Sequence, residues 1–263
     1  MQRWLVEAVN LATLVDIANM TKSDDLIGWA RNAAASVDHR RAATWRLAQV
    51  APEQAETLLD AGDPEIVLAV AGVMSSRPVE HLMKLASDSY APSGLRARAL
   101  ELLDVGVVRE HLEEVVHIAR NSSGKLLAAA VGALTSVSHK LPLDWLIARF
   151  RNVGRDARVG LVPAVGLHGA PSADWGLDML ELEIYDHCEE ELLSLVRSYG
   201  TAQKHAHRLE QLSQIAPEAK YVAIRTLRDR AAGDKGGLAL TEATGGGLSE
   251  TGADEGQLSS IRD

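Results

Sequence analysis

Hydrophobic positions between residues 63 and 152 repeat with a period of about thirty residues. Three consecutive segments, 63–90, 91–121 and 122–152, each open with a turn-prone cluster. Each then continues through about fourteen helix-forming residues, breaks, and ends in a second amphipathic stretch. Apolar residues fall in shared columns with spacings of 30 and 31 residues: Ala69, Ala99 and Ala130; Val70, Leu100 and Val131; and Val73, Leu103 and Leu134.

The pattern continues less regularly on both sides of these segments. Upstream, Ala43, Thr44 and Leu47 are in register, and downstream Val162 and Val165 occupy the columns of a fourth unit. A fifth unit and a final helix follow, and the first forty residues form two irregular helices that would cap the stack. We therefore predict capping helices over 1–37, a repeat region over 38–232 and a flexible tail over 233–263.

The columns have a physical explanation. A helix pair of this length cannot bury its apolar stripe alone, so neighbouring pairs are expected to stack and share a core. Alanine columns let adjacent helices approach closely, while Leu and Val columns fill the space between layers. The sequence therefore predicts an all-α fold, a right-handed α-solenoid of stacked antiparallel helix pairs.

Prolines support these helix boundaries. Proline at the first helical position loses no hydrogen bond, and four prolines stand where helices are expected to begin: Pro64, Pro92, Pro142 and Pro171. Pro163 instead falls inside a helical pattern, where it should kink or split the helix.

The stretches "GLRARALELL" and "GKLLAAAVGAL" resemble HEAT-like repeats, especially the short bacterial variety that also occurs in phycobilisome-lyase-like proteins. The resemblance covers roughly residues 38–230 and implies a protein-binding scaffold, because most HEAT-like families act in this way. A minority are enzymes, among them chromophore lyases and alkylpurine DNA glycosylases. The glycosylase resemblance would require an aromatic cluster with an acidic partner over a basic groove, which the sequence lacks. A coincidental bundle rich in Ala and Leu is the alternative interpretation.

Composition narrows the class of function. A formal net charge of −9 does not favour a general nucleic-acid binder, which needs a basic face. No apolar stretch is long enough to span a membrane, and the first twenty residues, which include Glu7 and Asp16, indicate a helix and not a signal peptide. The single cysteine, Cys188, excludes an internal disulfide and favours a cytoplasmic location.

Candidate catalytic and metal-binding groups do not form a convincing constellation. Glu114 and His117 lie on one helical face, one turn after Glu110, but no second Glu-x-x-His stands elsewhere to complete a di-metal site. Neighbouring acids should raise the pKa of Cys188 and weaken it as a nucleophile. We predict no enzyme activity and no cofactor. A zinc interpretation is weakened by poor ligand spacing, and a buried cysteine with exposed histidines is favoured: His187, Cys188, His205 and His207.

Charge and aromatic residues suggest where a protein would bind. From Asp174 to Glu191 there are eight acids and no base, and from Arg197 to Arg230 there are seven bases against three acids. These runs would guide a charged partner or are ordinary solvated faces. Trp145 and Trp175 would anchor a partner or, as we favour, fill the core. The candidate partner-binding residues of the second helices are Glu110, Glu114, His117, Trp145, Arg149 and Trp175.

The tail is the second candidate for recognition. Residues 231–263 contain eight of the 21 glycines, with six acids and two bases, a composition typical of disorder. A Gly-x-Leu-(Ala/Ser) pattern recurs there every ten residues, and repetition on a tether would raise the effective concentration of a partner's binding site. A neutral linker is the alternative. The motif residues are Gly237, Leu238, Gly247, Leu248, Ser249, Gly256, Leu258 and Ser259.

The sequence thus predicts a cytoplasmic, non-enzymatic adaptor whose helical surface binds one protein and whose tail is recruited or modified by another. It does not favour a membrane, a nucleic acid or a small molecule as partner. Two alternatives remain open: a HEAT-like enzyme, either a lyase or a metal-dependent one, and a nucleic-acid binder through the basic C-terminal helices.

Overall fold

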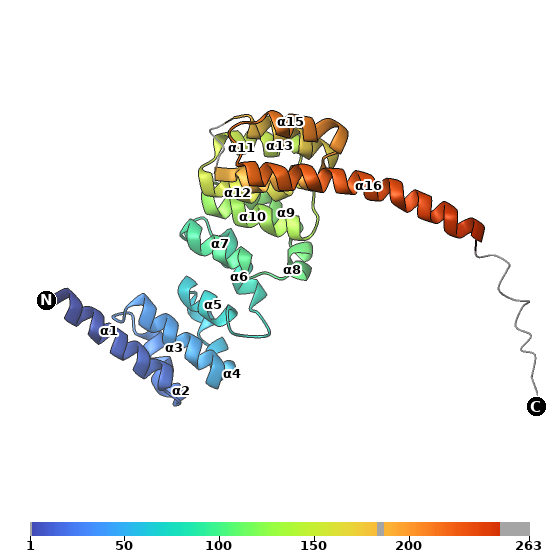
Figure 1. Ribbon diagram of the computed structural model, residues 1–263. Coiled ribbons are helices and arrows are strands. Elements are labelled where there is room, and N and C mark those ends of the chain that lie inside the picture. The colour runs from blue at the N-terminus through green and yellow to red at the C-terminus, as the bar shows by residue number, and fades with distance from the viewer. Residues whose placement is uncertain (1, 183–186, 248–263) are drawn as a thin grey trace, which may run out of the picture. The chain divides into compact units, whose positions relative to one another are not determined.

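The computed structural model describes residues 2–182 and 187–247, with the side chains of 11–182 and 187–233 (Figure 1). All regular structure in these residues is helical, and they contain no strand. The predicted all-α class is therefore confirmed.

The chain divides into two compact units, Met1–Leu167 and His168–Asp263. This division falls at the short connection between two helices, where Gly169 has a φ of 70° that favours glycine.

Unit 1 consists of short helices that pack mainly on helices close in sequence. Each of the first helices of the repeated segments contacts the next one: α3 contacts α5, α5 contacts α7, α7 contacts α10, and α10 contacts α12 (Figure 1). The second helices α6, α9 and α11 pack on the first helix that follows them. The bounds are α1 Gln2–Asn19, α2 Ser23–Arg31, α3 Val37–Val50, α4 Pro52–Glu56, η1 Leu59–Ala61, α5 Pro64–Ala71, α6 Val79–Ser87, α7 Ser93–Glu101, α8 Val105–Glu110, α9 Leu112–Asn121, α10 Gly124–Ser136, α11 Leu143–Asn152 and α12 Arg155–Gly166.

The predicted columns form the core of unit 1. Every residue of the first two columns is buried, and so are Val162 and Val165. In the third column only Leu134 is buried, whereas Val73 and Leu103 are half-buried. The reason is helix length: α5 ends at Ala71 and α7 at Glu101, before those two positions, while α10 continues past Leu134.

Two further sequence expectations are corrected. Of the kink or split expected at Pro163, the split does not occur, since α12 runs without a break from Arg155 to Gly166. Pro163 is exposed, so the carbonyl that loses its partner four residues earlier can be hydrated. The second helix expected around residues 105–121 is instead two helices, α8 and α9, separated at His111.

A recurring hydrogen bond joins consecutive helices. The fourth residue of three helices is basic, and its side chain donates to a carbonyl at the end of the preceding helix. Such carbonyls have no partner within their own helix, so a cation there satisfies the backbone and complements the helix dipole. The three bonds are Arg96 Nε to Ala86 O at 2.9 Å, Arg158 Nε to Phe150 O at 3.0 Å, and Lys220 Nζ to Leu212 O at 2.6 Å.

Helix α10 is the exception that shows how the bond is replaced. Its fourth residue is Leu127, which is fully buried. The end of α9 is capped instead by Arg149 of α11, which donates to Ser122 O at 2.5 Å. The end of α9 is therefore also capped by a basic side chain, but this side chain comes from α11 and not from the fourth residue of α10.

Ion pairs join segments of unit 2 that are about thirty residues apart in the sequence. Asp174 pairs with Lys204 at 2.6 Å, and Arg208 pairs with Asp178 at 2.9 Å and with Glu181 at 2.5 Å. Three acids of the acidic run are thus paired with two bases of the basic run within the unit: Asp174, Asp178 and Glu181 with Lys204 and Arg208. Its helices are α13 Ala170–Leu180, α14 Glu189–Tyr199, the π-helix η3 Ala202–Ala206, α15 His207–Gln211 and α16 Pro217–Gly247.

The last helix continues past residue 232, where the tail was predicted to begin. Gly237, Leu238 and Gly247 of the repeated motif lie within α16, and their side chains are not among those described. The other motif residues lie outside the described residues: Leu248, Ser249, Gly256, Leu258 and Ser259.

Candidate binding groove

A groove runs along the first helices of unit 1, and we call it the first-helix groove. Its larger part, of about 720 Å³, lies between α7, α10 and the start of α12. Its smaller part, of about 500 Å³, lies between α3, α5 and α7. Arg98 of α7 lines both parts, so the two adjoin at this side chain.

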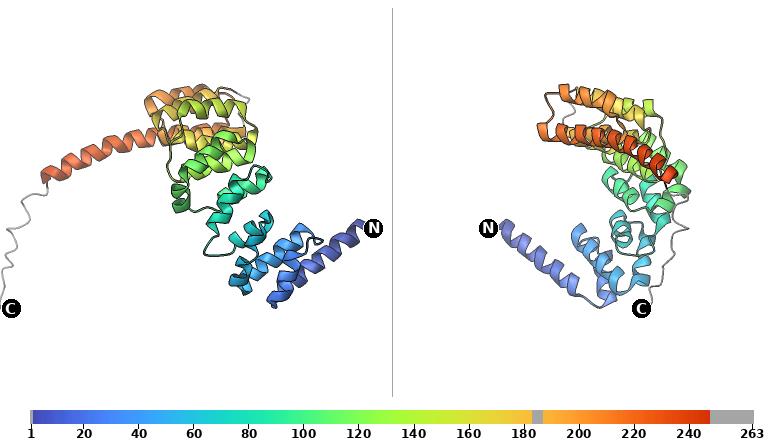
Figure 2. Two further views of the ribbon diagram at one scale, coloured as in Figure 1. Left: turned by 180° about the vertical axis from the view of Figure 1, so that it is seen from behind. Right: turned by 45° about the vertical axis from the view of Figure 1, so that its right-hand side comes forward.

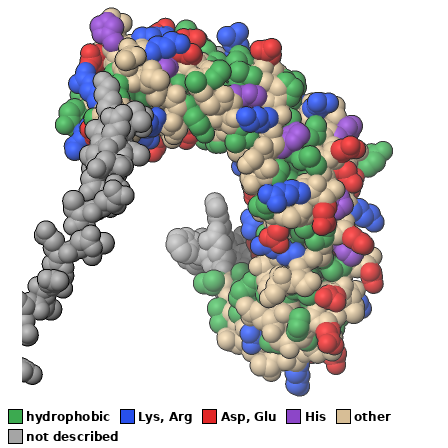
Figure 3. Space-filling view, turned by 90° about the vertical axis from the view of Figure 1, so that its right-hand side faces the viewer, with side chains coloured by type: hydrophobic (Ala, Val, Ile, Leu, Met, Phe, Trp, Pro, Cys, Tyr) green, Lys and Arg blue, Asp and Glu red, His purple; other side chains and the backbone are tan. Residues whose placement is uncertain are grey.

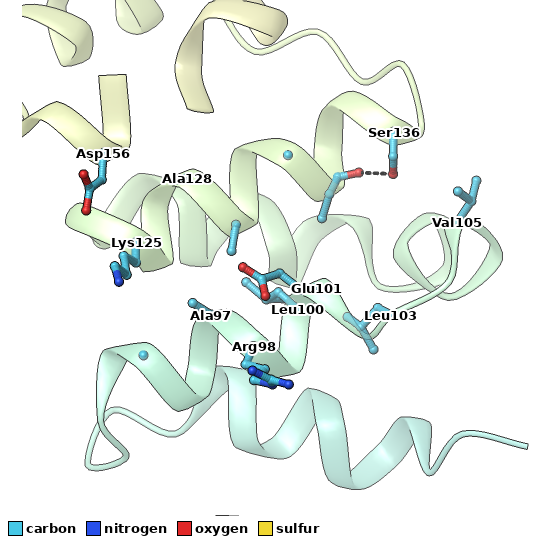
Figure 4. Close-up of a pocket in the computed structure, with 14 residues that line it drawn as sticks. Ala97, Arg98, Leu100, Glu101, Leu103, Val105, Lys125, Ala128, Ser136 and Asp156 are labelled. Carbon is cyan, nitrogen blue, oxygen red and sulfur yellow. Dashed lines mark hydrogen bonds between the residues drawn. The ribbon is translucent and has the colours of Figure 1, made fainter. Parts of the chain in front are cut away.

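Small residues form the floor of the larger part (Figure 4). A side-chain atom added at Gly94 or Gly132 would meet no atom within 4 Å, so the space above both glycines is open. By contrast, a Cβ added at Gly160 on α12 would lie 2.8 Å from the Cβ of Ala128. The small residues of α10 therefore have two effects. Ala128 lets α12 pack closely against α10, and Gly132 leaves the groove open. The small floor residues are Gly94, Ala97, Ala128, Ala129, Gly132, Ala133 and Ser136.

Charges of both signs border the groove. In the smaller part, Arg41 engages both local acids, Glu65 at 2.6 Å and Asp38 at 3.7 Å. Four other charged side chains make no ion pair or hydrogen bond within the described part of the chain: Arg98, Glu101, Lys125 and Asp156. These groups are available to a bound molecule.

The lining of the groove contains no histidine or cysteine, and its one hydroxyl, Ser136 Oγ, donates to Ala133 O at 2.7 Å (Figure 4). Among these residues no hydroxyl or thiol stands beside a base, which is the arrangement of a serine or cysteine nucleophile. The smaller part of the groove has an apolar surface. Trp45 of α3 is exposed there and lies beside Leu68 and Leu95.

The structure separates the predicted partner-binding residues. Glu114 and His117 line a different groove of about 430 Å³ with Arg96, whereas Glu110 is exposed and outside it. Glu114 pairs with His111 at 3.4 Å. Trp145, which is also in unit 1, does not line this groove.

The two tryptophans differ from each other. Trp175 in unit 2 is 6% exposed and belongs to the core, in agreement with the interpretation favoured from the sequence. Trp145 is half-buried, and the guanidinium of Arg149 lies 5.9 Å from its ring centroid. Arg149 is engaged in capping α9, so its role in the structure is to join helices.

The cysteine and histidine candidates are confirmed in part. Cys188 is buried and His207 is exposed, as predicted. His205 is not exposed but only 3% accessible, which corrects the prediction. Thr201 N–H donates to its Nδ1 at 2.9 Å, and its Nε2 lies 3.2 Å from Asp174 Oδ1. The described residues hold no group of three or more His, Cys, Asp and Glu side chains placed to bind a metal ion.

The ion pairs also set the electrostatics of unit 2. The hydrogen bond from Lys204, with smaller contributions from the charges of Lys204 and His205, lowers the pKa of Asp174 against an opposing effect of burial. Hydrogen bonds to Glu181 and Asp178 raise the pKa of Arg208. On the face shown in Figure 3, Lys and Arg side chains are interspersed with Asp and Glu side chains.

No family model, curated protein or solved structure matches this chain. Among the residues described, no helix combines the length and the apolar character needed to cross a bilayer. The groove is therefore the feature from which a function can be proposed.

Sequence reasoning missed this groove because it placed the partner on the second helices. The sequence feature that could have indicated the groove is the run of small residues in α10. Ala130 in that run belongs to a buried column, but Gly132 does not and opens into the groove. A count of small residues beyond those needed by the columns would have indicated an open surface on the first helices.

Proposed function

We propose that this chain is a non-enzymatic scaffold of the HEAT-like repeat type, whose first-helix groove binds a helical segment of a partner protein. The observation that carries the proposal is that two adjoining openings lie along the first helices, one between α3, α5 and α7 and the other between α7, α10 and the start of α12. A surface assembled from successive repeats in this way is the usual binding surface of repeat proteins.

The packing supports a solenoid arrangement. Successive first helices contact one another in chain order, and the apolar columns that recur every 30 or 31 residues are largely buried. The basic residue at the fourth position of α7, α12 and α16 repeats at equivalent places. Each of these features is expected when one supersecondary unit is stacked many times.

The chemistry of the groove favours a helix with apolar side chains on one face. The small floor residues admit apolar side chains close to the backbone, and Trp45, Leu68 and Leu95 offer an apolar surface at one end. The unpaired Arg98 and Lys125 would meet acids of the partner, and Glu101 and Asp156 would meet bases. Mixed charges around an apolar centre fix orientation and partner choice more than they add affinity.

The alternatives have less support from the described residues. Three of the seven bases between Arg197 and Arg230 pair with acids of other helical segments: Lys204, Arg208 and Arg228. Lys220 and Arg230 donate to carbonyls at helix ends. A nucleic-acid binder would need such cations free to contact phosphates.

The test is to fill the groove without disturbing the fold. Gly132→Trp places a large side chain in open space, and Gly28→Trp on α2 is a matched control, because a Cβ there also meets no atom within 4 Å and Gly28 does not line the groove. A photoreactive residue at Ala129 would identify the partner and the segment that it contributes.

We expect the Ala129 cross-link to be lost in Gly132→Trp and retained in Gly28→Trp, with unchanged helicity by circular dichroism. A cross-linked partner that survives Gly132→Trp with undiminished affinity would contradict the proposal. Deleting 248–263 in the same assay tests the predicted second role of the tail, since a tail-dependent partner would be lost while the groove cross-link remained.

A further inference from the structure

A separate pocket in unit 1 is lined by charges of both signs that do not pair with each other, and we call it the Arg96 pocket. Its volume is about 430 Å³, within the range of sites that hold small molecules. It lies where α6 and α9 end, beside the first turns of α7, and α6 contacts both of the other helices (the teal to green part of unit 1 in Figure 2). Ile118 is its one large apolar lining residue and is buried, whereas the other lining residues are polar or charged.

Arg96 is restrained in this pocket with part of its guanidinium group unused. Its Nε donates to Ala86 O at 2.9 Å, so the bond that caps α6 also holds the guanidinium group in place. The residue is half-buried, and its two Nη atoms make no hydrogen bond or ion pair with any described residue. Two Nη atoms form a fork that matches both oxygens of a carboxylate. Arg96 therefore offers a preorganised site for a carboxylate.

The other caps of this kind show that the fork is not needed for capping. Lys220 makes the equivalent bond with an ammonium group, at 2.6 Å from Leu212 O. Arg158 makes it through Nε, and its guanidinium group also lies over the ring of Phe150, at 6.0 Å from the centroid. The fork of Arg96 instead borders a pocket, so this arginine has a binding capacity beyond its cap.

Two carboxylates line the same pocket, and neither pairs with Arg96. Glu113 and Glu114 stand in the first turn of α9. Glu114 pairs with His111 at 3.4 Å, whereas Glu113 has no ion pair with any described residue. Opposite charges that border one pocket but remain apart are complementary to a molecule that carries both charges. A dianion such as phosphate would be attracted by Arg96 but repelled by both carboxylates.

Uncharged polar groups complete the lining on both sides. Ser87 follows Ala86, whose carbonyl Arg96 caps, and the hydroxyls of Ser87 and Ser89 make no hydrogen bond with any described residue. They are donors for a carboxylate held by Arg96. On α9, Asn121 uses its Nδ2 to donate to His117 O at 2.9 Å, which leaves its Oδ1 to accept from an ammonium group.

We propose that the Arg96 pocket binds a small zwitterion, with its carboxylate on the Arg96 fork and its ammonium group at Glu113. Amino acids have this chemistry, either free or as a lysine residue at the C-terminus of a protein. The inference is independent of the first-helix groove, because the two share no lining residue. The sequence did not favour a small molecule, since spacing alone does not show that these charges border one pocket.

The first experiment titrates the full chain with two zwitterions by isothermal titration calorimetry. In L-alanine the charges are as close as in any free amino acid, and in 6-aminohexanoate they are spaced as in a C-terminal lysine residue. We expect binding with a Kd of about 1 mM or lower, and the tighter of the two identifies the source. Hexanoate and hexylamine each lack one charge and should bind at least about tenfold more weakly.

The second experiment repeats the titration with variants of both charged sides. Glu113→Gln should raise the Kd at least about tenfold, and Glu110→Gln is its control, because Glu110 is exposed and outside the pocket. Arg96→Lys should keep the cap, as Lys220 does, but lose the fork and at least about fivefold in affinity. Arg158→Lys makes the same change at a cap outside the pocket and should leave the Kd unchanged.

Several results would overturn the inference. If neither zwitterion binds at about 20 mM, the pocket does not hold this class of molecule. If hexanoate or inorganic phosphate binds as tightly as the better zwitterion, the site is one for anions. If Glu113→Gln and Arg96→Lys both leave the Kd unchanged, any zwitterion that binds does so elsewhere on the chain.

Discussion

Two kinds of contact join neighbouring helices in this chain, and each unit offers a clear example of one of them. In unit 1, α12 meets α10 where Gly160 lies against Ala128, a contact between two small residues. In unit 2, α13 and the residue that follows it, Glu181, are linked through carboxylates to Lys204 and Arg208. Contacts between small residues depend on shape and leave no room for added atoms. Exposed ion pairs tolerate changes of shape but respond to salt and pH.

The largest effect should come from adding volume to the contact in unit 1. Gly160→Val forces new atoms against the Cα of Ala128, which lies only 3.1 Å from an added Cβ, so we expect a loss of about 3 kcal/mol. Gly132→Val, on the open side of α10, should change stability by less than about 1 kcal/mol. Urea denaturation measures the free energy of unfolding of both variants. Equal losses of stability would show that the contact between Gly160 and Ala128 is no tighter than the open side of α10.

In unit 2 the buried His205 should contribute more to the free energy of unfolding than the exposed ion pair between Lys204 and Asp174 beside it. His205→Ala removes the acceptor of Thr201 N–H and the neighbour of Asp174, and should cost about 2 kcal/mol. Lys204→Ala removes an exposed partner of the same carboxylate and should cost no more than about 0.5 kcal/mol. The reverse order in urea denaturation would mean that the ion pair, and not the buried ring, joins these segments.

The caps at helix ends are common to both units, so they should respond alike. Arg158→Met in unit 1 and Lys220→Met in unit 2 each remove one bond to a terminal carbonyl, and each should lose about 1 kcal/mol. Arg155→Met on the same helix as Arg158 is the control, because a cation in the first turn of a helix is unfavourable and its removal should not destabilise. A destabilised Arg155→Met variant would indicate a general charge effect instead.

The smallest effect is the pH dependence of the Asp174 pair. Since the pKa of Asp174 is lowered in the folded chain, its contribution is fully present above its ordinary range and is lost as pH falls below about 4. Its exposure keeps this contribution below about 1 kcal/mol. The stability difference between wild type and Asp174→Asn should therefore shrink from pH 6 to pH 3, and a constant difference would exclude this carboxylate as the source.

Much of the core of unit 1 could be predicted from the sequence, because burial repeats with the period of the segments. Ala99, Leu100 and Leu134 were placed correctly from spacing alone. The ends of the helices were not, since Val73 and Leu103 have the right period but stand beyond the last turn. Tertiary contacts decide where a short helix ends, and a periodic pattern carries little information about it.

The ion pairs of unit 2 were predictable in principle. Asp174 and Lys204 are 30 residues apart, as are Asp178 and Arg208, which is the spacing of neighbouring repeats. Acids and bases at that spacing lie on adjacent layers, so members of the two charge runs are expected to pair with each other. The groove was harder to foresee, because composition does not distinguish a buried alanine from one that borders an opening.

The fourth-position caps have a consequence for where the chain can be cut. The carbonyl belongs to one helix, but the side chain that satisfies it comes from the next, so a shortened chain that stops at Asn152 or at Leu212 leaves its last helix end uncapped. A fragment that keeps such a bond must therefore extend to the fourth residue of the next helix, which carries the capping side chain. Fragments of this protein should therefore overlap by one turn, and insertion or duplication of a segment would preserve the fold only if it took that turn with it.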